Sequence, residues 1–180
     1  MQDEKEFIRE LLNPKTQNIA FQKLLREYQR PLYNHIRNIV LNHDDTDDVL
    51  QNTFIKVFRY LKDFKGDSKL FSWMYRIATN EAITFINQKA KKNRTTSEAL
   101  QKKLVDNLKA DVYFDGNEIQ IKLQKAIAAL PEKQQLVFKM KYYEELKYEE
   151  ISEILGTSVG ALKASFHHAV KKIEDFVKNN

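Results

Sequence analysis

Few side chains in this chain have the types and spacing that catalysis requires. None of the 180 residues is a cysteine, which excludes a disulfide framework, a Cys-ligated zinc or iron–sulfur site and a thiol nucleophile. The four glycines lack the spacing of a phosphate-binding loop. We expect the histidines to lie on helix surfaces rather than around a shared metal ion: His35, His43, His167 and His168. The sequence therefore predicts no enzyme activity, no metal site and no cofactor.

An acidic cluster, Asp44, Asp45, Asp47 and Asp48, is the one group that could suggest a cation site. It lacks the alternating ligands and the central glycine of a calcium loop. Helix capping explains the cluster better. Asp45 or Thr46 would cap a helix, and Asp47 and Asp48 would lie in its first turn, where the helix dipole favours negative charge.

Nucleic-acid binding has better support, first from residues 146–163. A helical pattern of about eight residues stops at Gly156, and a second helical pattern starts within three residues. This spacing is typical of a helix-turn-helix, although a plain helical hairpin in a bundle remains the alternative. If the second helix, Ser158 to about Val177, enters a major groove, cations would meet phosphates and small polar side chains would meet base edges. The candidates for phosphates are Lys163 and Lys171, and those for base edges are Ser158, Ser165 and His168.

The stretch from Phe64 to Lys92 interleaves aromatic rings with cations. Bases of single-stranded DNA stack on rings while cations hold the backbone, so this mixture suits single strands. An aromatic core with a solvated basic face is the alternative. The rings are Phe64, Phe71, Trp73, Tyr75 and Phe85, and the cations are Lys65, Lys69, Arg76, Lys89, Lys91 and Lys92.

The elements that position these residues are predicted to be helices. Apolar residues make up 42% and charged residues 31% of the chain, which has only four Gly and three Pro, so an all-α fold is favoured over a sheet. Helical periodicity predicts helices over residues 3–12, 18–41, about 46–64 and about 69–91. Pro31 should kink or split the second of them.

The helical pattern weakens over residues 93–118, which we interpret as a linker that holds at most a short helix near 97–108. It returns over 119–130, where Ile119, Leu123, Ile127 and Leu130 mark the inner stripe, and over 132–143. The sequence thus predicts an N-terminal domain (1–92), a flexible linker (93–118) and a C-terminal helix-turn-helix domain (119–180).

The charge distribution is compatible with binding to a polyanion, and the hydropathy is compatible with a location inside the cell. Residues 1–92 and 121–180 are mildly basic, and the segment between them is slightly acidic. The first ten residues are too charged for a secretory signal. The longest uncharged apolar run, residues 126–130, is far shorter than the roughly 18 residues that cross a bilayer. We expect a cytoplasmic protein with no membrane insertion.

Several motifs in order resemble one known family. FKGDS (64–68) followed by WMYRIATN (73–80) resembles the signature of bacterial sigma factors, most closely the small two-domain extracytoplasmic-function class. DDVLQNTFIKVF (47–58) is similar to the polymerase-binding helix of that family. ALPEKQQ (129–135) and the stretch from Tyr148 to Lys163 resemble its promoter-reading domain. The resemblance covers about residues 20–92 and 121–175.

The resemblance implies that the chain binds core RNA polymerase, through its largest and second-largest subunits, and directs it to promoters. The residues matching the polymerase-docking surface are Asp47, Asp48, Gln51, Asn52 and Phe54. The loop from Phe64 to Ser72, which includes Asp67 and Ser68, matches the part of the family that captures an unstacked −10 base and so drives melting. Arg76 and Asn80 match the same part. The second domain would contact the −35 duplex, and the linker would run through the polymerase channels. An anti-sigma factor is a further implied partner.

The reading helix departs from the family pattern. Ala161, Ala164-Ser165, His168 and Val170 stand where the family often has polar or basic residues. We therefore expect weak −35 base recognition that depends on shape, phosphates or an upstream DNA-bound partner. The alternative function is a freestanding helix-turn-helix regulator that does not bind polymerase, for which the acidic helix at Asp47 would have no use.

Overall fold

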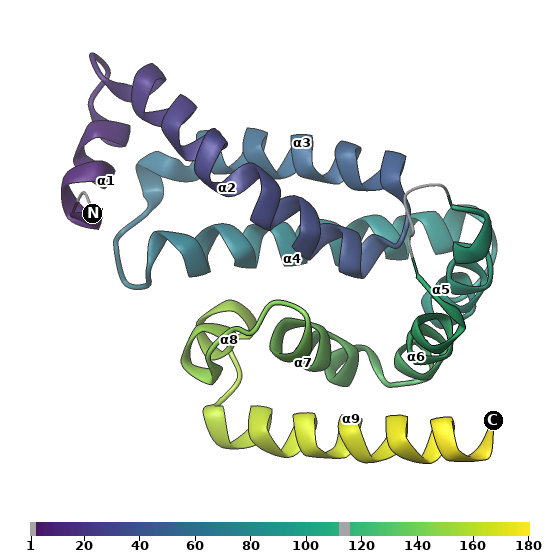
Figure 1. The fold of residues 1–180 in the computed structure, drawn as a ribbon. Coiled ribbons are helices and arrows are strands. Elements are labelled where there is room, and N and C mark those ends of the chain that lie inside the picture. Colours follow the sequence, from purple (N-terminus) through teal and green to yellow (C-terminus); the bar gives the residue numbers. More distant parts are fainter. Residues whose placement is uncertain (1–2, 112–115) are drawn as a thin grey trace.

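The computed structural model describes residues 3–111 and 116–180, and within them all regular secondary structure is helical (Figure 1). Nine α-helices and two short 3-10 helices follow one another, and this described part contains no strand. The all-α prediction is therefore confirmed.

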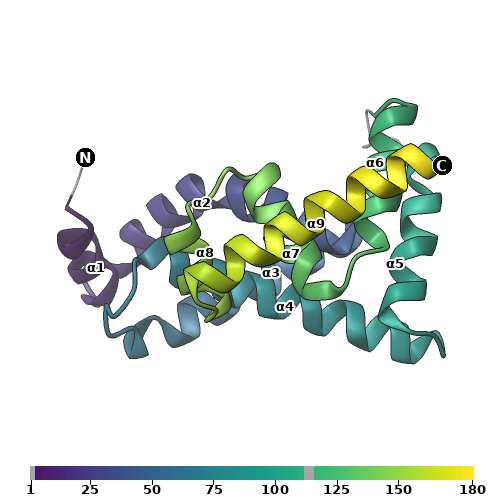
Figure 2. The same ribbon diagram turned by 90° about the horizontal axis from the view of Figure 1, so that it is seen from below.

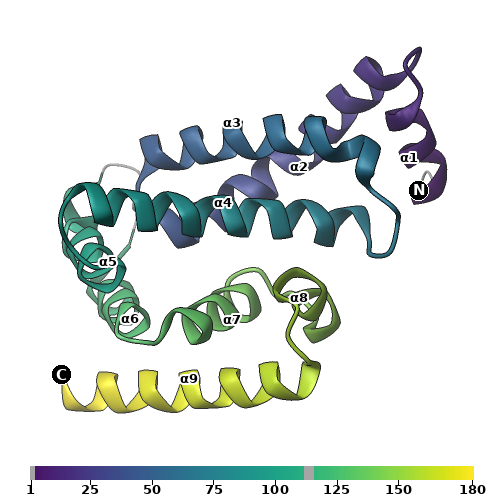
Figure 3. The same cartoon turned by 180° about the vertical axis from the view of Figure 1, so that it is seen from behind.

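The N-terminal half is built from α1 (Glu4–Leu12), α2 (Gln17–Val40), α3 (His43–Tyr60) and α4 (Leu70–Lys92), with the 3-10 helix η1 (Leu61–Asp63) after α3. Helices α2, α3 and α4 pack against one another, and α1 folds back on the start of α2 (Figure 3). The cap of α3 is Asn42, whose side chain accepts a hydrogen bond from the Asp45 backbone N–H at 2.9 Å. The predicted caps Asp45 and Thr46 instead lie within the helix.

Helix α2 continues through Pro31, so the predicted split does not occur. Proline removes one backbone donor, which leaves the carbonyl of Glu27 without its usual i+4 partner. Pro31 and Glu27 are both exposed, and water can satisfy that carbonyl. The cost of the proline is therefore small enough for packing of the buried face to hold one long helix.

The C-terminal half begins with α5 (Ser97–Asp106) and the 3-10 helix η2 (Leu108–Ala110), so the predicted linker segment holds the short helix. It continues with α6 (Glu118–Ala128), α7 (Glu132–Tyr142), α8 (Tyr148–Leu155) and α9 (Val159–Asn179). Helix α9 runs along the outer side of α6, α7 and α8 (Figures 1 and 2). The inner stripe of α6 is shifted from the prediction, because Ile119 is 77% exposed and Ile121 is buried instead.

One hydrophobic core runs through both halves of the molecule. Buried side chains of α2, α3 and α4 join in a single cluster with residues from α7, α8 and α9, among them Met140, Ile151 and Leu162. A second cluster lies between α6, α7 and α9. Nowhere in the described residues is a helix long and apolar enough to cross a membrane.

Candidate functional site

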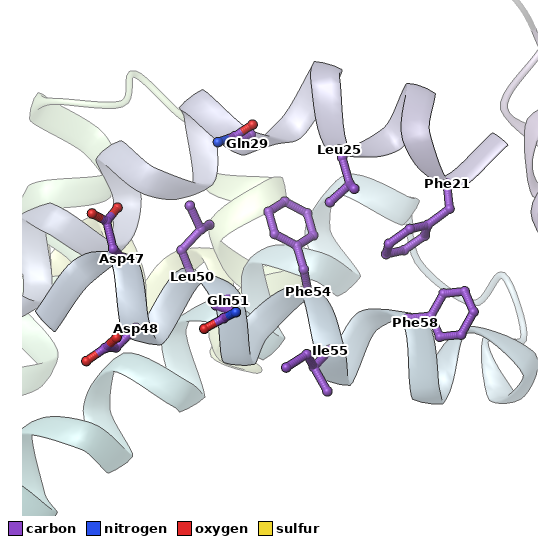
Figure 4. Close-up of a pocket in the computed structure, with 10 residues that line it drawn as sticks. All are labelled: Phe21, Leu25, Gln29, Asp47, Asp48, Leu50, Gln51, Phe54, Ile55 and Phe58. Carbon is purple, nitrogen blue, oxygen red and sulfur yellow. The ribbon is translucent and has the colours of Figure 1, made fainter. Parts of the chain in front are cut away.

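A groove of about 690 Å³ lies between α2 and α3 (Figure 4). Most of its lining is apolar, and the acidic residues lie at one end while Phe21 and Phe58 lie at the other. Ile55 and Phe58 are 49% and 45% exposed, and they join the other apolar side chains of the groove in one continuous patch. The complete lining is Phe21, Leu25, Gln29, Asp47, Asp48, Leu50, Gln51, Phe54, Ile55 and Phe58.

Helix α3 positions one wall of this groove by its 3.6-residue period. Asp47, Gln51, Phe54 and Phe58 recur at spacings of three and four and so share one side of the helix. The opposite side of α3, which includes Val49, Thr53 and Val57, is buried in the core.

The structure brings together four of the five residues predicted for polymerase docking: Asp47, Asp48, Gln51 and Phe54 all line the groove. Asn52 is exposed on the same helix but lies outside the lining. Phe54 is half-buried and faces the α2 side of the groove (Figure 4), so it belongs to a surface and not to the closed core.

The α2 wall of the groove was missed by the sequence analysis. Phe21 and Leu25 lie on the apolar stripe of α2, and neither they nor Gln29 were among the predicted docking residues. Phe21 meets Phe58 edge-on, with ring centroids 5.0 Å apart, and this contact closes the aromatic end of the groove. Only the spatial pairing of α2 with α3 reveals that the two stripes form one surface.

A series of side-chain contacts holds Asp47 at the acidic end of the groove. His43 Nε2 lies 3.5 Å from Asp47 Oδ2, and His43 Nδ1 lies 2.5 Å from the Tyr33 hydroxyl. Because Tyr33 belongs to α2, these contacts also link the two walls of the groove.

The second candidate surface is the loop 64–69 with the start of α4. Phe64 is buried and packs against half-buried Trp73, with ring centroids 5.0 Å apart. Gly66 has φ +75°, a left-handed conformation that turns the loop at low steric cost. Of the remaining predicted loop residues, Ser68 is half-buried and three are exposed: Lys65, Asp67 and Lys69.

The predicted −10 residues along α4 have different surroundings. Asn80 is exposed, whereas Ser72 is fully buried and its hydroxyl has no hydrogen-bond partner. Arg76 is exposed overall and donates from Nε to the backbone carbonyl of Glu153 at 3.1 Å. Phe71 and Tyr75 stack on each other at 4.2 Å between centroids, so part of the aromatic set belongs to packing.

At the other end of α4, the cations are divided between packing and solvent. Lys89 forms an ion pair with Asp45 of α3 and lies 5.7 Å above the Phe85 ring. Lys91 and Lys92 are exposed in the last turn, where positive charge suits the helix dipole.

The third candidate surface is α9 of the helix-turn-helix. Gly156 ends α8 with φ +65°, and Ser158 caps α9 by accepting from the Ala161 backbone N–H at 3.4 Å. The predicted phosphate residues Lys163 and Lys171 are exposed, as is His168, and Ser165 is half-buried. Lys163 Nζ lies 5.8 Å from the Tyr148 ring of α8.

Histidine burial differs from the expectation. His35 is 1% exposed, so it is a core residue and not a surface one. Among the residues that the structure describes, no group of three or more His, Asp or Glu side chains could hold a metal ion.

Comparison with known proteins identifies two family regions. The Sigma-70 region 2 family model matches residues 24–92, and the Sigma-70 region 4 family model matches residues 120–173. The ECF RNA polymerase sigma-E factor of Haemophilus influenzae is 29% identical over 169 residues, covering 88% of each chain. The RNA polymerase sigma-H factor of Pseudomonas aeruginosa is 28% identical over 163 residues, covering 86% of this chain and 84% of that protein.

The chain belongs to the extracytoplasmic-function class of sigma-70 factors. As a sigma factor it acts in transcription initiation. The groove and the start of α4 lie in sigma region 2, and the helix-turn-helix lies in region 4.

Two solved structures share the fold of this sigma factor. CnrH in complex with the cytosolic domain of CnrY aligns with TM-score 0.71 at 17% identity, over 99% of this chain and 98% of that one. The sigma factor RpoE of Bartonella quintana, in complex with the anti-sigma factor NepR, aligns with TM-score 0.65 at 18% identity, over 88% and 96% of the two chains. Both support the helical architecture over the part of the chain that they cover.

Proposed function

We propose that this sigma factor docks on core RNA polymerase through the groove between α2 and α3. The observation that carries the proposal is a large apolar groove with exposed Ile55 and Phe58 and a polar end that holds Asp47 and Asp48. An exposed apolar surface with a charged margin is typical of a protein interface. A freestanding DNA-binding regulator would gain nothing from such a surface, and its carboxylates would repel DNA.

The start of α4 and the loop before it then recognise the −10 element. Exposed Asn80 and half-buried Trp73 offer a hydrogen-bonding amide and a ring edge beside the basic loop residues Lys65 and Lys69. An unstacked base captured on such a surface offsets part of the cost of melting. Domain 1–92 would carry docking and melting, with 93–118 as the linker.

Domain 119–180 contacts the −35 duplex, mainly through phosphates. Lys163 and Lys171 are exposed on α9, but Ala161 and Ala164 offer no donors to base edges. An upstream DNA-bound partner would supply the missing specificity. Because CnrH and RpoE are found with CnrY and NepR, an anti-sigma factor is the regulatory partner we propose.

The docking proposal is tested by co-purification with core polymerase. Asp48→Lys combined with Phe54→Ala should abolish co-purification while circular dichroism stays unchanged, because both residues line the groove outside the closed core. The control is Asp44→Lys with Tyr60→Ala, which likewise reverses one carboxylate and removes one aromatic ring, at exposed α3 positions outside the lining. Co-purification that survives the first pair, or fails equally with the control, would contradict the docking surface.

A further inference from the structure

Little side-chain packing fixes the loop that is proposed above to capture the −10 base. Residues 65–69 are all exposed or half-buried, and the loop is anchored at its two ends. At one end Phe64 is 8% exposed, and its backbone N–H donates to the carbonyl of Leu61 at 3.1 Å. At the other end Leu70, the first residue of α4, is 1% exposed. The position of the loop therefore depends on how firmly α4 begins.

The start of α4 has no cap of its own. Lys69 occupies the N-cap position without a side-chain capping bond, because a lysine side chain carries donors and no acceptor. The first hydrogen bond of the helix runs from the Trp73 N–H to the Lys69 carbonyl at 3.0 Å. The backbone N–H groups of residues 70–72 precede that bond, so they need acceptors from outside the helix.

Helix α1 supplies such an acceptor. Glu4 Oε1 accepts a hydrogen bond from the Leu70 backbone N–H at 3.1 Å, although the two residues are 66 positions apart in the sequence. A carboxylate at this place also meets the positive end of the α4 dipole, which makes the contact charge-assisted. Glu4 therefore does for α4 what an N-cap aspartate or serine does within one helix.

Packing holds α1 beside the turn that leads from α3 into α4 (Figures 1 and 3). Leu11 is fully buried, and Phe7 and Ile8 are half-buried against the core cluster that contains both anchors of the loop. At the end of α1, Thr16 Oγ1 donates to the carbonyl of Glu10 at 2.7 Å. The capping carboxylate thus belongs to a helix that is anchored in the core.

We propose that Glu4 is a positioning residue for −10 recognition, which caps α4 from α1 and so fixes the loop that captures the base. The carboxylate acts through the backbone of α4 and does not touch DNA. A loop that is ordered beforehand loses less conformational entropy on binding, so the cap increases the affinity for the strand. This inference rests on the proposed role of α4 in −10 recognition.

The first test measures the cap itself, by hydrogen exchange of the Leu70 amide in the full chain. Glu4→Ala removes the acceptor, and exchange should become about fivefold faster, the size of effect that loss of an N-cap produces. Glu4→Gln keeps an acceptor oxygen and should retain most of the protection. Unchanged exchange in Glu4→Ala would overturn the inference, because the first turn would then not depend on the cap.

The second test measures how fast the holoenzyme forms the open complex on duplex DNA. Glu4→Ala should slow this step about fivefold, and Glu4→Gln should slow it by less than about twofold. Co-purification with core polymerase should stay at the parent level in both variants, because Glu4 lies outside the lining of the docking groove. Equal slowing by alanine and glutamine would assign the effect to charge alone, and weaker co-purification would assign it to docking. Either result would overturn the inference.

The matched control is Glu6→Ala, which removes an exposed glutamate from the same first turn of α1. The side chain and the charge change in the same way, and the bond to Leu70 is kept. Amide exchange and open-complex formation should each change by less than about twofold. Equal effects of the two alanine variants would show a general effect on α1 and would also contradict the positioning role.

Failure of the underlying function gives a different result. If Asn80→Ala leaves open-complex formation by the holoenzyme unchanged, α4 does not serve −10 recognition and the proposed function fails. If Asn80→Ala slows that step and Glu4→Ala does not, only the positioning role of Glu4 fails.

Discussion

Helices α4 and α9 are the two proposed DNA-contacting elements, and they differ in both content and freedom. The start of α4 offers an aromatic ring, an amide and a guanidinium, but Arg76 already has a partner on α8. Along α9, Lys163, His168 and Lys171 are exposed, yet Ala161 and Ala164 leave few groups that distinguish bases. The surface that is rich in recognition chemistry gives Arg76 to a contact with α8, while its Asn80 and Lys65 stay exposed to solvent like the cations of α9.

This difference suggests where control of promoter choice lies. A phosphate-binding helix that is always exposed contributes affinity without selectivity, which does little harm on a genome of competing sites. A base-capturing surface instead selects among sequences through the bases that it holds. The contrast therefore assigns the selective contact of the proposed promoter recognition to α4 and the unselective one to α9.

A promoter library gives the largest effect and tests the comparison directly. Randomising the −10 element should reduce transcription by more than about tenfold, since each lost base contact costs roughly 1–3 kcal/mol. Randomising the −35 hexamer should cost less than about threefold, because α9 relies on phosphates. Equal losses from the two elements would show that α9 reads bases and that the contrast with α4 is wrong.

Asn80→Ala isolates the base contact of α4. We expect about a tenfold slower formation of the open complex on duplex DNA, since the lost amide contact supports an extruded base. A pre-melted bubble at the same promoter should restore part of the rate. The control is Asn87→Ala, an exposed asparagine two turns further along α4, which should change the rate by less than twofold. Equal loss on duplex and bubble templates would exclude base capture.

Lys139, which is buried on α7, gives a prediction about how stability depends on pH. Burial lowers its pKa from 10.5 to about 8, and attraction to Glu144 only partly opposes that shift. Between these pKa values the unfolded chain binds more protons than the folded chain, so the free energy of unfolding should increase as pH rises above about 8. Ionisation of unfolded tyrosines reverses this trend above about pH 10, because burial raises the pKa of Tyr28 and Tyr143 to about 12.

Lys139→Met should therefore remove the increase between pH 8 and 9.5 and add about 1–3 kcal/mol to stability at pH 7. Urea denaturation at a series of pH values measures both effects. If the free energy of unfolding of the variant rises with pH as steeply as that of the parent protein, another group causes the pH dependence.

The smallest expected effect concerns the turn that aims α9. Gly156 has φ +65°, and a Cβ there meets no atom within 4 Å, so Gly156→Ala should cost about 1–2 kcal/mol from backbone strain alone. Gly160→Ala within α9 also meets open space and has no positive φ, so it should stabilise by about 0.5–1 kcal/mol. Thermal unfolding should show the opposite signs, and two changes of equal sign would contradict the turn geometry.

Local features were predicted well from the sequence because local chemistry determines them. Helix α4 ends at Lys92 and α8 ends before Gly156, close to the predicted positions, since period and breaker residues mark those boundaries. Of the seven groove residues on α3, four were grouped without a structure through the resemblance to the polymerase-binding helix: Asp47, Asp48, Gln51 and Phe54.

The missed features depend on which helix faces meet in space. His35 gave no sign of burial, because its partner Glu144 is 109 residues away. The α2 wall of the groove was not predicted, since an apolar stripe looks the same in sequence whether it meets a neighbouring helix or an open groove. Of the two outcomes predicted for Pro31, a kink or a split, the split did not occur, because the exposure that makes the proline tolerable is a tertiary property.

The contact between α4 and α8 has a consequence during synthesis. Helix α4 is complete at Lys92, whereas α8 begins at Tyr148. At roughly 5–20 residues per second, the ribosome needs about 3–11 s to make the intervening chain. For those seconds the nascent N-terminal half lacks the contact between α4 and α8. A partner that acts on the nascent chain meets Arg76 before the carbonyl of Glu153 can accept its hydrogen bond.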